Sequence, residues 1–334
     1  MIITQTPLRV SFFGGGTDLK EYYQENSGAV LSVAINKYIY IVVNSRYDDN
    51  IVLNYSEREK VDSVKEVKHN IFREALKLAE IESGIEITSI ADIPSEGSGL
   101  GSSSSFTVGL LNALFAYKGE FKNPYELAEL ACQIEINILN EPIGKQDQYA
   151  AAFGGFKTYQ FNPDHTVTVK KLDLSIKDYN ALNLYSIMFY TGITRKASSV
   201  LSDQKENVPN KIDVLDRLKE LVFTGENCFT KLDIKTIGIL LDINWEEKKK
   251  LSKKIGNKDL NKIYEQAKMA GIYGGKLLGA GGGGFFLFLC PPENQQKLKT
   301  ILRNYKELPF SYEKFGSRII LNTNDSYGFI SHDI

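Results

Sequence analysis

Pro94-Ser95-Glu96-Gly97-Ser98-Gly99-Leu100-Gly101-Ser102-Ser103-Ser104-Ser105 is the stretch that decides the fold of this chain. It follows an alternating apolar run at residues 85–90, which predicts a strand, and it precedes the apolar segment 106–117, which predicts a helix. Closely spaced glycines let a backbone approach a ligand, and the first N–H groups of a helix lack internal partners and favour an anion. The order of strand, glycine loop and helix therefore predicts a phosphate-binding loop and a nucleotide ligand.

Two non-functional interpretations of this segment are also possible. Glycine and serine also make linkers, and a serine run can simply cap a helix. The tight spacing between the strand and the helix favours the phosphate-binding loop over both. The loop is not a G-x-x-x-x-G-K-[ST] motif, because it has no lysine, and Ser102 at the sixth position departs from G-x-G-x-x-G.

The composition is that of a globular protein with an ample core. The 334 residues suggest two domains, which we place at 1–185 and 186–334. A net charge of −1 offers no general attraction for nucleic acid or an anionic membrane, and no apolar run is long enough to span a bilayer. Three scattered cysteines argue against a disulfide scaffold or a zinc site and predict a reducing, cytoplasmic location. The Lys248-Lys249-Lys250 run, next to two glutamates, is interpreted as a solvated helix face.

The remaining pattern predicts an α/β protein. Residues 28–43 suit paired strands around a bend, and residues 65–82 suit a helix. A capping box at residues 123–126 starts a helix that extends to about Leu139. Residues 155–172 and 181–190 predict strands, residues 195–270 are mostly helical, and the glycine-rich segment 274–284 leads into a buried strand at 285–289.

Three further segments hold residues suited to chemistry. Gly14-Gly15-Gly16-Thr17-Asp18 predicts a sugar-binding corner with Asp18 as hydroxyl acceptor, or else an ordinary turn. Glu135 has small and apolar helical neighbours, so it is either a Mg²⁺ ligand or a residue at the helix edge that reaches solvent. Asp147 stands between glutamines in a Gly- and Ala-rich segment and is suited to accept a proton from a substrate hydroxyl, although an aspartate in a loop is often structural.

Taken in order, segments 7–18, 94–104, 135–147 and 276–284 resemble the motifs of the GHMP kinase superfamily, which includes galactokinase, homoserine kinase, mevalonate kinase and phosphomevalonate kinase. The first segment, Arg9-Val10-Ser11-Phe12-Phe13 followed by the glycine corner, departs from the galactokinase pattern. Together with residues 22–23 and 34–40, it looks like the D-glycero-D-manno-heptose 7-phosphate kinases. Fucokinase-type enzymes have a related corner.

The resemblance implies a GHMP kinase fold, with an N-terminal ribosomal-protein-S5-domain-2-like domain and a C-terminal ferredoxin-like domain. It implies ATP and Mg²⁺ as cofactors, with Mg²⁺ held by Ser103 and Glu135. The residues that it places around the ATP phosphates are Pro94, Glu96, Gly97, Ser98, Gly99, Leu100, Gly101, Ser102, Ser103 and Ser104. It also implies that the loop 279–284 packs against the phosphate loop.

For the acceptor, the resemblance implies that Asp147 contacts the attacking hydroxyl, with Arg9 beside it, and that Gly14, Gly15, Gly16, Thr17 and Asp18 contact the sugar. The reaction would be phosphorylation of the C1 hydroxyl of a heptose 7-phosphate. Arg195 and Lys196, after a predicted strand, are candidates for the sugar phosphate, or else ordinary surface cations. A kinase of an unphosphorylated sugar and a catalytically silent sugar and ATP sensor are the rivals. The anomer, a homodimer, and the choice between base and orienting role for Asp147 stay open.

Overall fold

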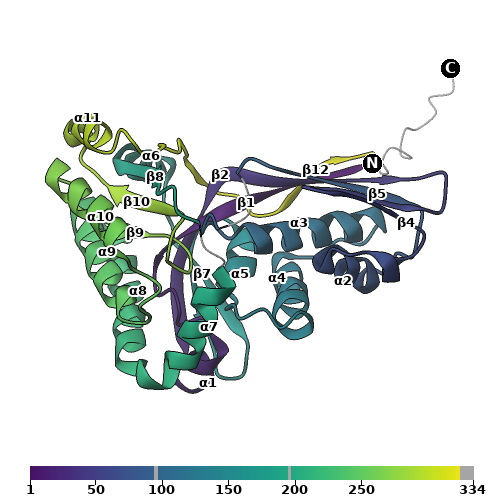
Figure 1. Ribbon diagram of the computed structural model, residues 1–334, viewed down its shortest axis with the longest axis horizontal. Coiled ribbons are helices and arrows are strands. Elements are labelled where there is room, and N and C mark those ends of the chain that lie inside the picture. Colours follow the sequence, from purple (N-terminus) through teal and green to yellow (C-terminus); the bar gives the residue numbers. More distant parts are fainter. Residues whose placement is uncertain (94–96, 195–196, 324–334) are drawn as a thin grey trace.

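A long antiparallel pair of strands, β1 (Ile2–Phe13) and β2 (Gly28–Ser45), forms the spine of the molecule (Figure 1). The computed structural model describes residues 1–93, 97–194 and 197–323. Among these residues the pair belongs to a nine-stranded sheet of order β12-β1-β2-β5-β3-β4, which β6, β7 and β11 extend. The added strands are β3 (Ile51–Asn54), β4 (Arg58–Val61), β5 (Ile85–Ala91), β6 (Phe156–Phe161), β7 (Val167–Lys171), β11 (Tyr312–Glu313) and β12 (Arg318–Asn322).

Strand β2 is one element, whereas the sequence predicted paired strands around a bend. Pro7 pairs with Tyr38 and the next residue, Leu8, pairs with Ile35, so that two residues of β2 have no partner in β1. These two residues are Asn36 and Lys37, the polar pair that interrupts the apolar run. Extra residues in one strand make a bulge, which bends the strand without ending it.

Helices cover one face of the large sheet (Figure 1). The central one is α3 (Ser102–Tyr117), which is buried along nearly its whole length and packs on β1, β2 and the neighbouring helices. A helix that is apolar on all sides is buried on all sides. The helices that pack beside α3 are α2 (Asn70–Leu78), α4 (Pro124–Cys132) and α5 (Gln146–Phe153), with a 3-10 turn at Val64–Glu66 and a π-helix at Gln133–Ile138. Elsewhere, α1 (Lys20–Asn26) contacts a 3-10 turn at Val208–Asn210, and α6 (Ile176–Tyr185) packs on the strand that follows it.

A second, three-stranded antiparallel sheet of order β8-β10-β9 lies at the other end of the molecule. Aromatic side chains from its strands and helices, among them Trp245, Tyr264 and Phe286, fill a separate hydrophobic core. Its strands are β8 (Ser186–Tyr190), β9 (Gly274–Leu277) and β10 (Phe285–Leu289), and its helices are α7 (Ala197–Asn207), α8 (Ile212–Thr230), α9 (Ile234–Lys249), α10 (Lys258–Ala270) and α11 (Pro292–Ile301).

Several predicted elements are confirmed and two are wrong in extent. The capping box at Asn123 and Glu126 is present, and the helices of the segment 195–270 and the strand at 285–289 form as expected. The helix expected over 65–82 is limited to α2, and the strand expected over 181–190 is helix α6 up to Tyr185 and strand only afterwards.

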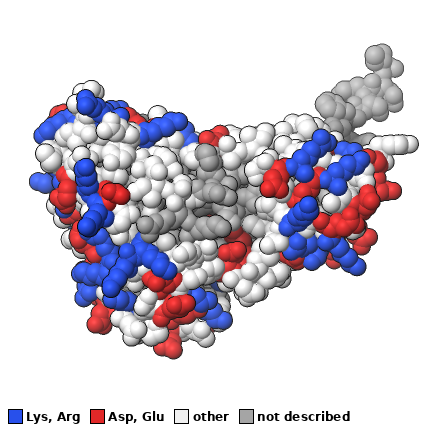
Figure 2. Space-filling view, in the orientation of Figure 1, with Lys and Arg blue, Asp and Glu red and all other residues white. Residues whose placement is uncertain are grey.

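The second sheet begins at residue 186, and β11 and β12 return from the C-terminal part to the large sheet. The division of the chain into domains 1–185 and 186–334 stays our proposal. Both signs of charge occur on the face shown in Figure 2, where lysine and arginine gather over the end formed by the C-terminal helices. No described helix is both long enough and apolar enough to cross a membrane.

Candidate active site

The glycine loop that the sequence predicts to bind phosphate, called the phosphate loop below, lies between β5 and α3. Gly97, Gly99 and Gly101 all adopt positive φ angles, between 68° and 76°, which other residues adopt at a cost. Gly101 is the N-cap of α3, and no side chain among the described residues caps this helix start. The loop is held internally by Ser98 and Ser102, whose hydroxyl oxygens lie 3.0 Å apart. The helix start is therefore open to an anionic ligand.

A second glycine loop, residues 278–284, packs directly on the phosphate loop. A Cβ on Gly99 would lie 2.6 Å from the carbonyl oxygen of Leu278, and a Cβ on Gly284 would lie 2.5 Å from the carbonyl oxygen of Ser98. Neither position admits a side chain without displacing backbone. The glycine run at 279–284 thus lets the C-terminal part of the chain close against the phosphate loop, as the resemblance implied.

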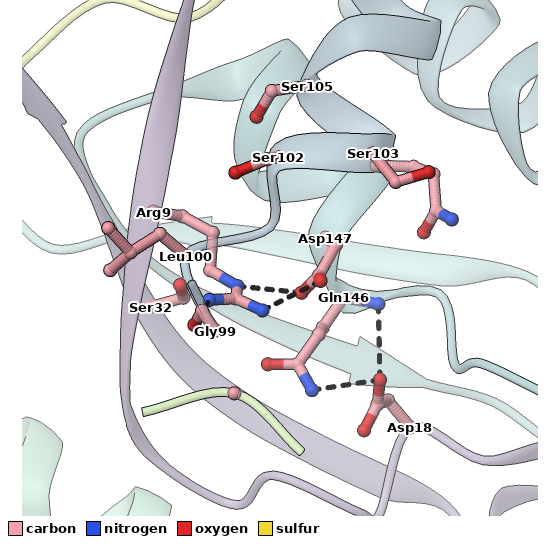
Figure 3. A network of polar contacts seen from close by, with 12 residues as sticks. Arg9, Asp18, Ser32, Gly99, Leu100, Ser102, Ser103, Ser105, Gln146 and Asp147 are labelled. Carbon is pink, nitrogen blue, oxygen red and sulfur yellow. Dashed lines mark hydrogen bonds and ion pairs between the residues drawn. The ribbon is translucent and has the colours of Figure 1, made fainter. Parts of the chain in front are cut away.

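Arg9 and Asp147 form a bidentate ion pair at the centre of the site (Figure 3). Nε and Nη2 of Arg9 each donate to one carboxylate oxygen at 2.7 Å, and Nη1 donates to the carbonyl of Gly99 at 2.7 Å. The Arg9 side chain is only 5% exposed, whereas that of Asp147 is 25% exposed. One arginine on β1 therefore fixes both the acid on α5 and the phosphate loop.

Glu135 lies beside the start of α3. One carboxylate oxygen accepts from the hydroxyl of Ser103 at 2.7 Å, and the other accepts from the Gln148 amide at 2.7 Å. Burial raises the pKa of Glu135, and the hydrogen bonds from Ser103 and Gln148 oppose that shift. No salt bridge reaches Glu135 from the part of the chain that the structure describes.

These features of Glu135 fit a divalent cation. A buried carboxylate without a cationic partner is costly, and a metal ion relieves that cost. The residue projects from a π-helix, a wide turn that often occurs at functional sites. No group of three or more His, Cys, Asp or Glu suited to a metal occurs among the described residues. One carboxylate and one serine match a Mg²⁺ ion that takes its other ligands from nucleotide phosphates and water.

Some residues of the predicted sugar corner, 14–18, line a cavity, and others only support its backbone. Asp18 accepts from the backbone of Gly16 at 3.0 Å and from the Gln146 side chain at 3.0 Å (Figure 3), and burial, followed by the charge of Asp147, raises its pKa. Gly16 and Asp18 line a cavity. The hydroxyl of Thr17, by contrast, is fully buried and lies 2.8 Å from the carbonyls of Gly14 and Ala29. Gly14 and Thr17 thus shape the corner, and they do not line the cavities described next.

Asp147 stands where two cavities meet. The larger, of about 530 Å³, is lined by the phosphate loop, Ser103 and Glu135. The smaller, of about 50 Å³, is lined by residues of the corner, including Asp18. Arg9 and Asp147 line both. A third cavity, of about 630 Å³, also has Asp18 in its lining. The arrangement can hold a phosphate donor on one side of a carboxylate and a hydroxyl acceptor on the other.

One residue of the site was missed by sequence reasoning. Lys248, interpreted there as part of a solvated face, is only 4% exposed and lines the smaller cavity. The buried positions of α9 include Ile237, Leu241 and Asn244, at spacings of three and four. Lys248 continues that stripe, a helical period that would have placed it inward. Four residues that the sequence analysis proposed for the site lie outside the described residues: Pro94, Glu96, Arg195 and Lys196.

Comparison with known proteins gives consistent results. The family model described as "GHMP kinases N terminal domain" matches residues 63–155, and that described as "GHMP kinases C terminal" matches residues 227–307. The D-glycero-alpha-D-manno-heptose 7-phosphate kinase of Campylobacter jejuni is 31% identical, over 94% of this chain and 97% of its own. The crystal structure of a D-glycero-D-manno-heptose 1-phosphate kinase from Bacteroides thetaiotaomicron superposes with a TM-score of 0.82 at 25% identity, covering 96% of this chain and 99% of that one. A putative sugar kinase from Campylobacter jejuni superposes with a TM-score of 0.76 at 28% identity, covering 95% and 97%.

Proposed function

Because this chain belongs to the GHMP kinase family and is a sugar kinase, we propose that it transfers the γ-phosphoryl group of ATP to the C1 hydroxyl of D-glycero-D-manno-heptose 7-phosphate. The product would be the 1,7-bisphosphate, a precursor of nucleotide-activated heptose for a surface polysaccharide. The observation that carries the proposal is the Arg9–Asp147 pair at the junction of the phosphate-loop cavity and the cavity beside Asp18. The heptose substrate itself is proposed from the name of the relative that is 31% identical.

The phosphate loop is the proposed site of the ATP phosphates. Of the residues implied for this role, the described ones, Gly97 to Ser104, form the glycine loop and the first turn of α3. Ser103 and Glu135 would hold Mg²⁺, which neutralises phosphate charge when it is bound. The hydrogen bond between these two side chains keeps both oxygens at the phosphate cavity.

Asp147 is the proposed acceptor of the hydroxyl proton. Each of its oxygens receives one hydrogen bond from Arg9 and keeps lone-pair capacity for a second donor. Arg9 thereby fixes the carboxylate toward the acceptor, and phosphoryl transfer depends mainly on such positioning and on charge neutralisation. The anomeric hydroxyl is more acidic than an ordinary alcohol, so orientation with late proton transfer would suffice.

The acceptor is proposed to bind against Gly15, Gly16 and Asp18, with Gly14 and Thr17 supporting them. Arg195 stays the proposed contact for the 7-phosphate. We propose a cytoplasmic enzyme, since its three cysteines are free and two of them, Cys132 and Cys290, are buried.

A kinase of an unphosphorylated sugar is the second candidate. The 630 Å³ cavity beside Asp18 includes Lys145, but this lysine is already paired with Glu129 at 3.0 Å. The lining also holds a second lysine, Lys20, and three carboxylates, those of Asp18, Glu129 and Asp164. Three carboxylates against two lysines, one of which is already paired, suit hydroxyl groups better than a phosphate, so this cavity favours a neutral part of the sugar.

The test is ADP release from Mg²⁺-ATP with a panel of acceptors, namely heptose 7-phosphate, unphosphorylated heptose, fucose, galactose and mevalonate. The proposal requires turnover with heptose 7-phosphate that greatly exceeds turnover with the others. Preferred use of a neutral sugar would replace the proposed substrate by the second candidate. An absence of turnover with every acceptor would favour a sugar and ATP sensor.

A further inference from the structure

Lys248 differs from its two neighbours in the lysine run at the end of α9. Lys249 and Lys250 pair with Glu246 and Glu247 one turn away, and their side chains are 24% and 51% exposed. Lys248 is 4% exposed. No carboxylate pairs with it among the described residues. A buried ammonium without an ionic partner is costly, and such a group usually has a functional reason.

The contacts of Lys248 direct its ammonium group to the smaller cavity. Nζ donates to the carbonyl of Gly279, in the loop that packs on the phosphate loop. A Cβ on Gly15 would lie 3.5 Å from Nζ, so the ammonium group stands against the glycine corner. An ammonium has three donors, and Gly279 uses one of them. The others are available to a ligand in the cavity that Lys248 lines together with Asp18 and Asp147.

The surrounding charges favour an oxygen that becomes negative. Burial, followed by the charge of Arg9, lowers the pKa of Lys248 to about 8, while Asp18 and Asp147 oppose the shift. Lys276, fully buried on β9, donates to the carbonyl of Phe12 at 3.0 Å, and burial and the charges of Lys248 and Arg9 hold its pKa well below the usual range. Because Arg9 and Asp147 pair with each other, an oxygen that becomes negative beside Lys248 would stabilise the charged form of this lysine against burial and the charge of Arg9.

Lys248 lies on the side of the site proposed for the acceptor, away from the side proposed for the nucleotide. Arg9 and Asp147 line both cavities, whereas Lys248 lines only the smaller one, on the side of Asp18. We infer that Lys248 is a catalytic residue whose ammonium group donates a hydrogen bond to the acceptor oxygen of the sugar and stabilises the negative charge that develops there. This inference rests on the proposed kinase reaction, and it adds a charged side chain from the C-terminal part of the chain to the Arg9–Asp147 pair from the N-terminal part.

Phosphoryl transfer then breaks two bonds and forms two. The acceptor O–H bond breaks and its proton goes to the carboxylate of Asp147. The acceptor oxygen forms a bond to the γ-phosphorus, and the bond from that phosphorus to the bridging oxygen of ADP breaks, with the electron pair leaving on ADP. Lys248 keeps its protons throughout.

The test compares Lys248→Met with Lys250→Met, a matched control from the same run, using the panel acceptor that the wild type phosphorylates best. Removing one preorganised donor from a developing oxyanion lowers kcat by roughly 100- to 1,000-fold, and we expect that loss for Lys248→Met. The KM for ATP and the affinity for a non-hydrolysable ATP analogue should change less than about threefold, or roughly 0.7 kcal/mol. Lys250→Met should match the wild type. Lys248→Cys alkylated with bromoethylamine restores an ammonium group and should recover much of kcat.

The outcomes separate this inference from the proposed function. If Lys248 only held the Gly279 loop in place, Lys248→Met would show a weaker ATP affinity and a lower unfolding midpoint with little change in kcat. That result would overturn the inference. Loss of kcat with a substrate other than heptose 7-phosphate would support the inference and contradict the proposed substrate. A wild type without turnover on any acceptor would overturn both, because no acceptor oxygen would then exist.

Discussion

Replacing Glu135 with glutamine should preserve or improve the stability of the ligand-free protein and should remove the proposed Mg²⁺-dependent activity. In the wild type the carboxylate is 1% exposed and accepts two hydrogen bonds of 2.7 Å, from Ser103 and Gln148. Glutamine preserves the shape and removes the charge. The Oε1 atom of Gln148 is buried and has no hydrogen-bond partner within residues 1–93, 97–194 and 197–323, so a flip of that amide lets it accept from the new NH₂ group.

Two opposing effects determine how Glu135→Gln changes the free energy of unfolding. Hydrogen bonds to a charged group contribute about 1.5–3 kcal/mol and neutral ones about 0.5–1.5 kcal/mol, so two weakened bonds cost about 2–3 kcal/mol. Removing an unpaired buried carboxylate relieves an effective penalty of several kcal/mol per ion. We therefore expect the free energy of unfolding without Mg²⁺ to stay the same or to rise by about 1–2 kcal/mol at pH 7.5.

The sign of the pH dependence provides an internal check. Burial raises the pKa of Glu135 above its ordinary value of 4.5, so the folded state binds this proton more tightly than the unfolded state. The stability that the protonated form contributes is fully present below 4.5 and is lost as the pH rises through the folded pKa. The advantage of Glu135→Gln over the wild type should therefore grow with pH in that window. Asp18, whose pKa is also raised, is present in both proteins and does not affect the difference.

The assay is urea unfolding with and without Mg²⁺ and an ATP analogue, together with turnover at varied Mg²⁺. Wild type should gain stability when the metal–nucleotide complex is added, and Glu135→Gln should gain much less. Turnover of the variant should fall by about 100-fold or more, as expected for the loss of a charge-stabilising group. A ligand-free variant that is more than about 1 kcal/mol less stable than wild type, a clear cost by the standard of single mutations, would show that the Glu135 carboxylate is not a burden on the folded state.

Three further predictions concern the rest of the site. Gly99→Ala forces a Cβ to within 2.6 Å of the Leu278 carbonyl at a φ of 73°, so ATP-analogue affinity measured by calorimetry should fall by about tenfold or more, or 1.4 kcal/mol, and unchanged affinity would contradict the packing argument. For the wild type, kcat/KM should decline above pH 8 as Lys248 loses its proton. The guanidinium of Lys248→Arg stays charged at this pH, so a decline of kcat/KM that persists in this variant would show that another group causes it. Arg9→Lys keeps one charge and loses the bidentate geometry, so kcat should fall by roughly 10- to 100-fold, and a wild-type rate would show that the fork is dispensable.

The phosphate loop and the helix after it could be predicted because local sequence decides them. Positive φ angles need the glycines of residues 97–101, and the apolar segment that follows can only be a buried helix. The capping box at Asn123 is likewise a local signal. A similar box at Ser175 and Asp178 starts α6, and attention to it would have corrected the strand expected from residue 181.

What sequence reasoning missed depends on contacts between distant segments. The pairing of Arg9 with Asp147 joins residues 138 positions apart, and it came from family resemblance and not from either segment alone. The direction of Lys248 depends on which face of α9 meets β9, which the charges of the lysine run concealed. Likewise, the roles of Gly14 and Thr17 within the corner follow from their contacts with Ala29 on β2.

The most direct test of the account is turnover of heptose 7-phosphate by wild type and by Asp147→Asn, measured as ADP release with Mg²⁺-ATP and with ATP-analogue binding as the control. We predict clear turnover by wild type, a loss of about 100-fold or more in the variant, typical for general-base removal, and ATP-analogue binding within about threefold of wild type. A variant that keeps the wild-type rate would contradict the assignment of Asp147 as the residue that receives the acceptor proton.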